Sequence, residues 1–169
     1  MDKKTQETMF SSKSEEWETP GDFYDRLHKQ YKFTLDPCAT PKTAKCEKYY
    51  TKEDDGLSKN WSGHSVFVNP PYGREIKKWV EKSYEESRKK DTTVVMLIPA
   101  RTDTKYWHEY CMHADVIFFV KGRLHFKNKV IADYTGKTKT SPAPFPSAVI
   151  VFYRNKTTPR PIAGTMINK

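Results

Sequence analysis

The sequence has 169 residues, of which 36% are hydrophobic and 14% aromatic, a length and composition that suit a single domain with a substantial core. No apolar run is long enough to cross a membrane, and the first residues lack the apolar segment of a signal peptide, so we expect a cytoplasmic protein with no membrane partner. Three cysteines without a Cys-x-x-Cys pair argue against a disulfide framework.

The formal charge of +9 comes entirely from the last part of the chain. Residues 1–120 contain 20 Lys and Arg against 20 Asp and Glu, whereas residues 121–169 contain 10 against a single acidic residue. This concentration of positive charge favours contact with nucleic acid, although a solvated basic tail has the same composition. Phe126, Tyr134 and Phe145 interleave with the basic residues, which favours contact with bases.

The first ordered segment is predicted to begin at Trp17. Residues 1–16 are polar and without periodicity, so we expect them to be disordered. Thr19 is a suitable N-cap and Pro20 a suitable first residue for a helix that extends to about Gln30. Trp17 and this turn either pack in the core or form one wall of a small-molecule pocket.

Residues 31–37 predict a strand that ends in Asp36-Pro37, and the carboxylate of Asp36 at this strand end could hold an ammonium group or ribose hydroxyls in a doubly wound sheet. Only the 27 residues 38–64 separate this strand from the next clear one, which leaves room for one short strand near residues 48–50 and then mostly loop. That loop contains Asp54-Asp55-Gly56-Leu57. It is either a common turn or a site where Asp55 accepts a hydrogen bond from a nucleotide-like cofactor.

The central motif of the chain is Ser65-Val-Phe-Val-Asn-Pro-Pro-Tyr-Gly73. Residues 66–68 predict a buried strand, which must end at Asn69 because the prolines that follow donate no hydrogen bond. The same prolines hold Asn69 extended at the carboxyl edge of the sheet, where ligands bind in open α/β folds. A fixed amide with the ring of Tyr72 nearby suits the binding of a flat nucleobase. The alternative is a structural turn with Tyr72 packed on its rim.

The whole chain predicts one α/β domain over residues 17–156. Beyond the central motif we expect an amphipathic helix at residues 76–90, a central strand at 92–98, a capped helix at 101–111 and a strand at 116–120. A basic DNA-facing loop at 121–146, an antiparallel last strand at 148–153 and a basic tail at 157–169 complete the prediction. His108, Cys111 and His113 do not share one helix face, so no metal site is predicted.

Seven motifs follow one another in order between Trp17 and Tyr153. They are Trp-x-Thr-Pro, Leu-Asp-Pro-Cys-Ala, Asp-Gly-Leu, Phe-Val-Asn-Pro-Pro-Tyr-Gly, Pro-Ala-Arg-Thr-Asp-Thr, Gly-Arg-Leu-x-Phe and Ala-Pro-Phe-Pro-Ser-Ala. Together they resemble the bacteriophage-type DNA N-6-adenine methyltransferases, a Dam-like family. The resemblance implies a compact Rossmann-like class I methyltransferase fold, with a mostly parallel sheet, an antiparallel last strand and a compressed region around the second and third strands.

The resemblance also implies S-adenosylmethionine as cofactor, S-adenosylhomocysteine as product and adenine in double-stranded DNA as substrate, in a bacterial host cell. It assigns the reaction to Asn69, Pro70, Pro71 and Tyr72. The target adenine would be flipped out of the duplex. The side-chain oxygen of Asn69 and the carbonyl of Pro70 would accept the hydrogens of its 6-amino group, and Tyr72 would stack on the base.

Further site residues are carried over by the same resemblance. Cofactor contacts are expected from Trp17, Thr19, Pro20, Asp36, Pro37, Cys38, Asp54, Asp55, Gly56, Leu57 and Asn69. DNA contacts are expected from Arg101, Arg123, Lys127, Lys129, Lys137 and Lys139, although Arg101, Asp103 and Arg123 also fit ion pairs on the rim. The chain departs from most methyltransferases in one respect, because Asp36-Pro-Cys-Ala-Thr-Pro replaces the Gly-rich turn after the first strand.

Two other functions fit part of the sequence. The Asn-Pro-Pro-Tyr motif also serves methyltransferases that act on guanine in RNA or on a protein glutamine, which usually carry an added recognition domain. A nucleic-acid-binding module without catalysis would keep the basic residues but would not need the central motif. A monomer or a weak homodimer is expected.

Overall fold

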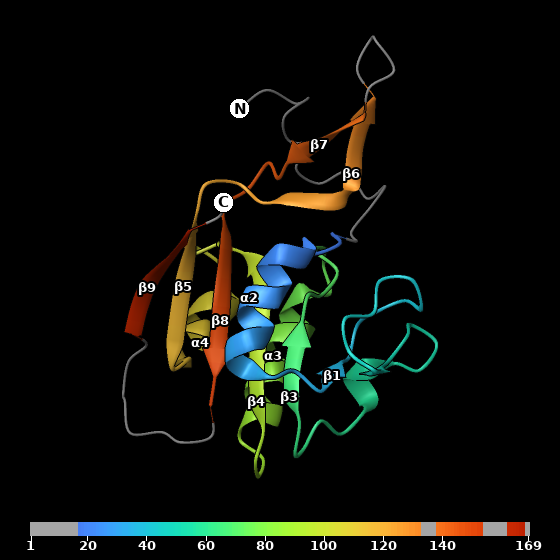
Figure 1. Ribbon diagram of the computed structural model, residues 1–169. Helices are drawn as coiled ribbons and strands as arrows, with labels where there is room; N and C mark the ends of the chain where they lie inside the picture. Colours follow the sequence, from blue (N-terminus) through green and yellow to red (C-terminus); the bar gives the residue numbers. More distant parts are fainter. Residues whose placement is uncertain (1–16, 133–137, 154–161, 168–169) are drawn as a thin grey trace.

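The computed structural model describes residues 17–132, 138–153 and 162–167, and contains a large sheet flanked by helices and a separate two-stranded sheet (Figure 1). Residues 1–16, which were predicted to be disordered, lie outside the described residues, as does Lys137. For Lys129 and Lys139 the structure describes the backbone only.

Seven strands form the large sheet: β1 (Leu35–Asp36), β2 (Lys48–Tyr49), β3 (Ser65–Val68), β4 (Thr93–Pro99), β5 (Val116–Lys121), β8 (Ser147–Phe152) and β9 (Ile162–Ile167). Their order is β2-β1-β3-β4-β8-β5-β9. β8 runs antiparallel between β4 and β5, and every other pair in the sheet is parallel. The predicted α/β class, with a mostly parallel sheet of the Rossmann-like methyltransferase type, is therefore confirmed.

The antiparallel strand predicted at residues 148–153 is β8, but it is not the last strand. Residues 162–167 form β9, parallel to β5, where the sequence predicts only a weakly specified tail. Glycine lowers the strand propensity of this segment. In the fold, however, a side chain at Gly164 would lie 3.2 Å from the ring of Phe118, so its absence lets β9 lie close to β5.

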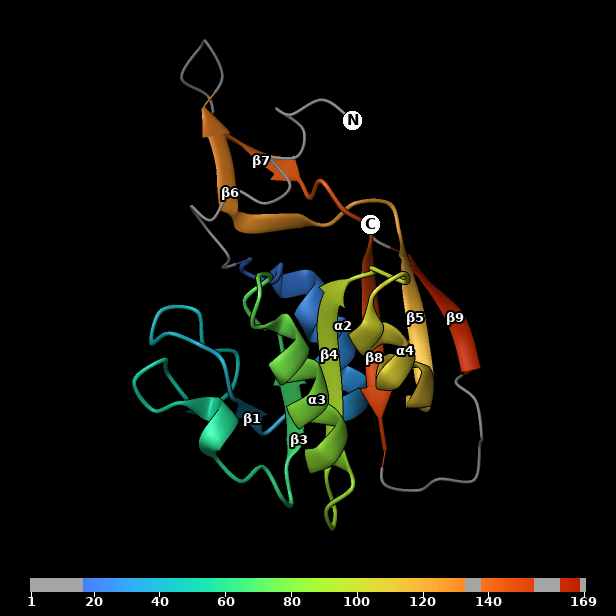
Figure 2. The same cartoon turned by 180° about the vertical axis from the view of Figure 1, so that it is seen from behind.

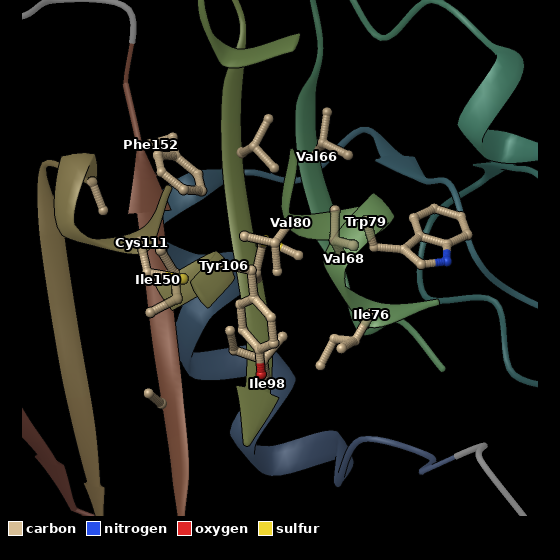
Figure 3. Packing of buried hydrophobic residues seen from close by; sticks show 14 of the residues in the cluster. Val66, Val68, Ile76, Trp79, Val80, Ile98, Tyr106, Cys111, Ile150 and Phe152 are labelled. Atoms are coloured by element: carbon tan, nitrogen blue, oxygen red, sulfur yellow. The ribbon is translucent and has the colours of Figure 1, made fainter. Parts of the chain in front are cut away.

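Helices cover both faces of the large sheet. α2 (Gly21–Tyr31) lies on one face, and α3 (Ile76–Ser87) and α4 (Lys105–Glu109) lie on the other (Figures 1 and 2). Successive strand residues alternate between the two cores. On β4, Val94, Met96 and Ile98 pack under α3 and α4, whereas Val95 and Leu97 pack under α2. Figure 3 shows the first of these two cores, with Ile98, Trp79 and Val80 among its labelled side chains.

Residues predicted as a basic loop form an antiparallel hairpin instead, with strands β6 (His125–Ala132) and β7 (Thr138–Pro142). The hairpin rises beyond the carboxyl edge of the parallel strands (Figures 1 and 2). At its base, Phe126 and Phe145 join the core under α2. The Lys-rich and Pro-rich composition of residues 121–146 is typical of a loop. A two-stranded hairpin buries few residues, so its strands lack the apolar alternation by which strands are predicted from sequence.

Two further elements differ from the sequence prediction. α2 begins at Gly21 with Pro20 as N-cap residue, because the side chain of Thr19 bonds to Asn69 and not to the helix. The chain leaves α2 through Lys32, which has a left-handed φ of 52°, so the strand predicted from residue 31 is reduced to β1. The short helical turns η1 (Gly56–Ser58) and η2 (Cys111–His113) complete the fold. Within the described residues, no helix is long and apolar enough to span a membrane.

Candidate active site

Asn69 follows β3 directly, at the carboxyl edge of the parallel strands. β1 and β4 flank β3 in parallel and end at Asp36 and Pro99 on the same edge. The strand ends where the prolines predict, because neither Pro70 nor the residue after it has a backbone N–H to continue the ladder. Residues that follow neighbouring strands therefore meet around Asn69.

Hydrogen bonds hold the carboxamide of Asn69 at both ends. Its nitrogen donates to the hydroxyl of Thr19 (2.9 Å) and to the carbonyl oxygen of Trp17. Its oxygen accepts from the hydroxyl of Tyr72 (2.7 Å), which also lies 3.0 Å from the carbonyl oxygen of Leu97. A carbonyl oxygen has two lone pairs, so one acceptor position of Asn69 remains for a ligand.

The ring of Tyr72 belongs to an aromatic cluster. Trp17 stacks on it with a centroid separation of 6.2 Å and an interplanar angle of 19°, and Phe126 and Phe145 meet it edge-on. Burial, assisted by the nearby thiol of Cys38, raises the pKa of Tyr72 well above its usual value. Tyr72 thus remains a hydrogen-bond donor to Asn69, while one face of its ring is covered by Trp17.

A cleft of about 870 Å³ opens beside this turn. Its volume lies within the range of roughly 300–1,000 Å³ that is usual for small-molecule sites. Of the residues predicted to contact a cofactor, Pro20 and Asp54 are not part of its lining. The others line it together: Trp17, Thr19, Asp36, Pro37, Cys38, Asp55, Gly56, Leu57 and Asn69.

The lining of the cleft is acidic, although the whole protein has a formal charge of +9. Carboxylates outnumber ammonium groups by three in this lining, with Glu18, Asp36, Glu53, Asp55 and Glu75 against Lys45 and Lys52. An excess of one sign of charge in a concave site raises the local concentration of ligands of the opposite sign. The cleft therefore favours a cationic ligand.

Asp36 is the buried carboxylate of the cleft, with only 5% of its surface exposed. One oxygen accepts from the backbone N–H of Cys38 (3.4 Å) and the other from that of Lys45 (3.1 Å). Burial raises the pKa of Asp36 to about 6, while these two hydrogen bonds and the charge of Lys45 act in the opposite direction. Each oxygen keeps a further lone pair, so Asp36 both shapes the loop after β1 and can accept from a ligand.

Gly56 allows two walls of the cleft to touch. A Cβ at this position would lie 1.9 Å from the carbonyl oxygen of Pro37, so only glycine fits. The indole N–H of Trp61 donates to the carbonyl oxygen of Gly56 (3.0 Å) and fixes the segment from beneath. Asp55, just before it, has a left-handed φ of 53° and is exposed. The loop after β1 is therefore held close to η1.

The polar side-chain atoms of Asp54 and Cys38 also have partners within the protein. Asp54 accepts from the backbone N–H (2.8 Å) and hydroxyl (2.9 Å) of Thr51, so its carboxylate closes a turn. Cys38 donates its thiol to the backbone carbonyl of Asn69 (3.3 Å). Burial, followed by the charge of Asp36, raises the pKa of the Cys38 thiol well above its usual value, so it remains protonated.

Comparison with known proteins identifies the family of this chain. The profile described as DNA N-6-adenine-methyltransferase (Dam) matches residues 6–169. The chain belongs to the DNA N-6-adenine-methyltransferase (Dam) family. The resemblance drawn from the seven motifs is thereby confirmed.

Named relatives of this Dam-family chain come from phages and a bacterium. A DNA N-6-adenine-methyltransferase of Haemophilus phage HP1 (strain HP1c1) is 28% identical over 123 residues, which are 70% of each chain. One of Escherichia phage T1 is 31% identical over 113 residues, 64% of this chain and 45% of the relative. A putative methyltransferase of Escherichia coli (strain K12) is 34% identical over 65 residues, 34% of this chain and 71% of the relative.

The basic residues that this Dam-family chain is predicted to place on DNA lie in two regions. Arg101 follows β4 and Arg123 follows β5, both at the carboxyl edge, and both have interactions within the protein. Lys127 lies in β6, where its side chain is exposed and its backbone N–H donates to the carbonyl oxygen of Glu18 (3.1 Å). Lys129 and Lys139 belong to the hairpin strands.

Several residues that line the cleft were not predicted from the sequence. Lys45 and the pair Thr40 and Thr43 lie in the loop after β1, where no periodicity marks a site. Trp79 was predicted only as part of an amphipathic helix face. It packs in the core, and its ring edge also reaches within 3.3 Å of the Cβ position of Gly56.

Proposed function

We propose that the chain is a site-specific DNA methyltransferase that transfers the methyl group of S-adenosylmethionine to the 6-amino group of a flipped-out adenine. The observation that carries the proposal is the fixed carboxamide of Asn69, whose oxygen keeps one acceptor position beside an acidic cleft. Membership of the Dam family and the names of the phage relatives support the same substrate.

S-adenosylmethionine fits the cleft in charge and in size. It carries a sulfonium and an ammonium group against one carboxylate, and the lining has an excess of carboxylates. Asp36 would accept from the ammonium group, Asp55 from the adenosyl part, and Leu57 and Trp79 would supply apolar contacts. When bound, the cofactor supplies an electrophilic methyl group, and its sulfur keeps the electron pair of the broken bond.

Asn69 and Pro70 would orient the amino group of adenine. The second lone pair of the Asn69 oxygen would accept one hydrogen and the Pro70 carbonyl the other, which withdraws the nitrogen lone pair from the ring and directs it toward the cleft. Both acceptors are neutral, and the nitrogen loses a proton to water only after transfer. Such positioning is worth about 7 kcal/mol or more in well-oriented intramolecular reactions.

Tyr72 would form the wall on which the flipped base stacks. Because the indole of Trp17 covers one face of that ring, the base would take its place as the Trp17 side chain rotates away. The carbonyl oxygen of Trp17 can stay on Asn69 during this rotation, since it belongs to the backbone. The hairpin β6–β7, with Lys127 at its base, would lie against the duplex.

Tritium transfer from labelled S-adenosylmethionine to unmodified duplex DNA tests this function, with nucleoside analysis of the product. The variants are Asn69→Ala and, as a matched control, Asn60→Ala, whose side chain accepts from Ser62 and Lys89 away from the cleft. We expect label on adenine with the native chain and with Asn60→Ala, and none with Asn69→Ala.

Other results would contradict the proposal in separate ways. Label on RNA or on a protein but not on DNA would refute the substrate and leave the methyltransferase chemistry. DNA binding without any transfer would favour a binding module. Undiminished transfer by Asn69→Ala would refute the role of the central turn.

A further inference from the structure

Lys45 is the more enclosed of the two lysines that line the cleft. Its side chain is 16% exposed, whereas Lys52 is an exposed residue. Hydrogen bonds fix its backbone on both sides, because the N–H donates to Asp36 (3.1 Å) and the carbonyl oxygen accepts from the hydroxyl of Tyr24 (2.9 Å). The position of Lys45 is therefore set by the main chain and does not depend on its own ammonium group.

The turn that precedes Lys45 is closed by reciprocal bonds between Thr40 and Thr43. Each backbone N–H donates to the hydroxyl of the other residue, at 3.0 and 3.2 Å, and the two hydroxyls lie 2.9 Å apart. The backbone N–H of Ala44 adds a bond to the carbonyl oxygen of Thr40 (2.9 Å). Such a turn holds its shape without a ligand, which lowers the entropic cost of binding one.

The ammonium group of Lys45 has a distant partner. Its nitrogen lies 3.8 Å from an oxygen of Glu18, well beyond the 2.7–2.9 Å or so of a charge-assisted hydrogen bond. Asp36 lies in the same corner of the cleft, bonded to the backbone of Lys45. This corner of the cleft thus contains two carboxylates and one ammonium group. A ligand that brings both an ammonium group and a carboxylate could pair the first with Asp36 and the second with Lys45.

We propose that Lys45 binds the carboxylate of the cofactor's amino-acid tail, while Asp36 binds the ammonium group of the same tail. This assignment rests on the proposed function and specifies how the cofactor is recognised. The corner lies beside Asn69, since residues 17–19 connect Glu18 to the Asn69 carboxamide through Trp17 and Thr19. The tail and the transferred methyl group branch from the same sulfur, so both belong at this end of the cleft.

Calorimetric titration of the full chain with three probes tests the assignment. S-adenosylhomocysteine carries both charged groups, 5′-deoxy-5′-(3-aminopropylthio)adenosine carries only the ammonium group, and 5′-methylthioadenosine carries neither. The variants are Lys45→Gln, with Lys45→Arg for rescue and Lys29→Gln as the control, an exposed lysine of α2 outside the cleft. Asp36→Asn tests the other half of the pair.

We expect Lys45→Gln to weaken S-adenosylhomocysteine roughly ten- to hundredfold, as befits a lost charge-assisted bond, and to leave the other two probes unchanged. Asp36→Asn should weaken both amine-bearing probes and spare 5′-methylthioadenosine. Lys45→Arg should retain most of the affinity, and Lys29→Gln all of it.

Equal loss on all three probes, or no loss on any, would overturn the assignment, as would the same selective loss in Lys29→Gln. A native chain that binds S-adenosylhomocysteine no better than 5′-methylthioadenosine would also overturn it, while leaving the adenosyl site in place. A native chain that binds none of the probes would refute the cofactor of the proposed function itself.

Discussion

The side-chain nitrogen of Asn69 donates to the hydroxyl of Thr19 across 2.9 Å, which ties the segment before α2 to the central turn. Because the hydroxyl of Thr19 accepts this hydrogen bond, it fixes which end of the carboxamide is the nitrogen. The oxygen of Asn69 then faces Tyr72 and the ligand position. Thr19→Val keeps the volume of the side chain and removes the acceptor. We expect the single-turnover rate of methyl transfer to fall about tenfold, the worth of one such hydrogen bond.

Thr19→Ser is the control for this prediction, since it restores the hydroxyl and should restore most of the rate. Thr19 and Asn69 both line the cleft, so the affinity for S-adenosylhomocysteine is measured as well, and we expect it to change less than the rate. A native rate in Thr19→Val would show that Asn69 is oriented without this bond.

Asp36 should make stability and ligand binding respond to pH in opposite directions. Its pKa is raised by burial from 3.8 to about 6, so its stabilising contribution is complete below pH 3.8 and is lost as the pH rises through about 6. We expect the native chain to lose on the order of 2–3 kcal/mol relative to Asp36→Asn between pH 4 and pH 7, measured by denaturant unfolding.

Binding should follow the ionised form of the same carboxylate. The affinity for S-adenosylhomocysteine is expected to fall as the pH drops below about 6, because a protonated Asp36 no longer pairs with an ammonium group. Asp36→Asn should bind more weakly, with a flat profile between pH 5 and 7. An identical slope in that variant would assign the titration to another group.

Gly56→Ala should destabilise the fold and open the cleft. The new Cβ would lie 1.9 Å from the carbonyl oxygen of Pro37, so one wall must move. We expect a loss of about 1–3 kcal/mol in unfolding free energy and weaker binding of S-adenosylhomocysteine. Gly21→Ala is the control, because its Cβ would meet only the flexible end of Lys127, at 3.4 Å. Native stability in Gly56→Ala would contradict the close contact.

Glu86 should contribute to stability only at moderate and high pH. It is 2% exposed and accepts from the ammonium groups of Lys82 (2.6 Å) and Lys89 (2.7 Å) and from the backbone of Trp61 (2.9 Å). Burial alone would raise the pKa of Glu86, but these bonds more than offset it, and the pKa is lowered. Its contribution is therefore present above the unfolded pKa and is lost as the pH falls through the folded value.

The variant Glu86→Gln measures this contribution. We expect it to lose roughly 1–3 kcal/mol at pH 7 and to converge with the native chain in acid. Glu75→Gln removes the exposed pair with Lys78 (2.7 Å) and should cost less than about 1 kcal/mol. Equal effects of the two substitutions would argue against a special role for the buried carboxylate.

Neutralising Lys127, Lys129, Lys137 and Lys139 to glutamine should weaken DNA binding and flatten its salt dependence. Each phosphate contact contributes about 0.9 to the slope of log affinity against log salt, so four contacts would reduce the slope by about 3–4. Exposed lysines elsewhere serve as the control: Lys29, Lys32, Lys77 and Lys90. An unchanged slope in the first variant would exclude these residues from the DNA interface.

The sequence was most informative where one residue type permits few conformations. The prolines after Asn69 predicted the end of β3, and the periodic apolar residues predicted α3, because both signals are local. Order within the chain also revealed the family, since seven motifs in a fixed sequence are far more specific than one.

The contacts around Asn69 were less accessible from sequence. Thr19 lies 50 positions before Asn69, and its suitability as an N-cap concealed that its hydroxyl is used by the turn. Lys45 has no pattern of its own, because its place in the cleft follows from a backbone bond to Asp36. Tertiary hydrogen bonds of this kind leave no periodicity and appear only once the fold is known.

The antiparallel strand β8 lies in the middle of the large sheet, although it comes late in the chain. All six of its residues are buried, and it pairs with both β4 and β5. Val94 pairs with Phe152, 58 positions later (152 − 94), so the sheet closes only through long-range contacts, which slow folding. During synthesis, one apolar edge of β4 therefore remains unpaired until residue 152 has been made. A chain truncated before β8 would keep this edge unpaired and would be an aggregation-prone fragment rather than a smaller enzyme.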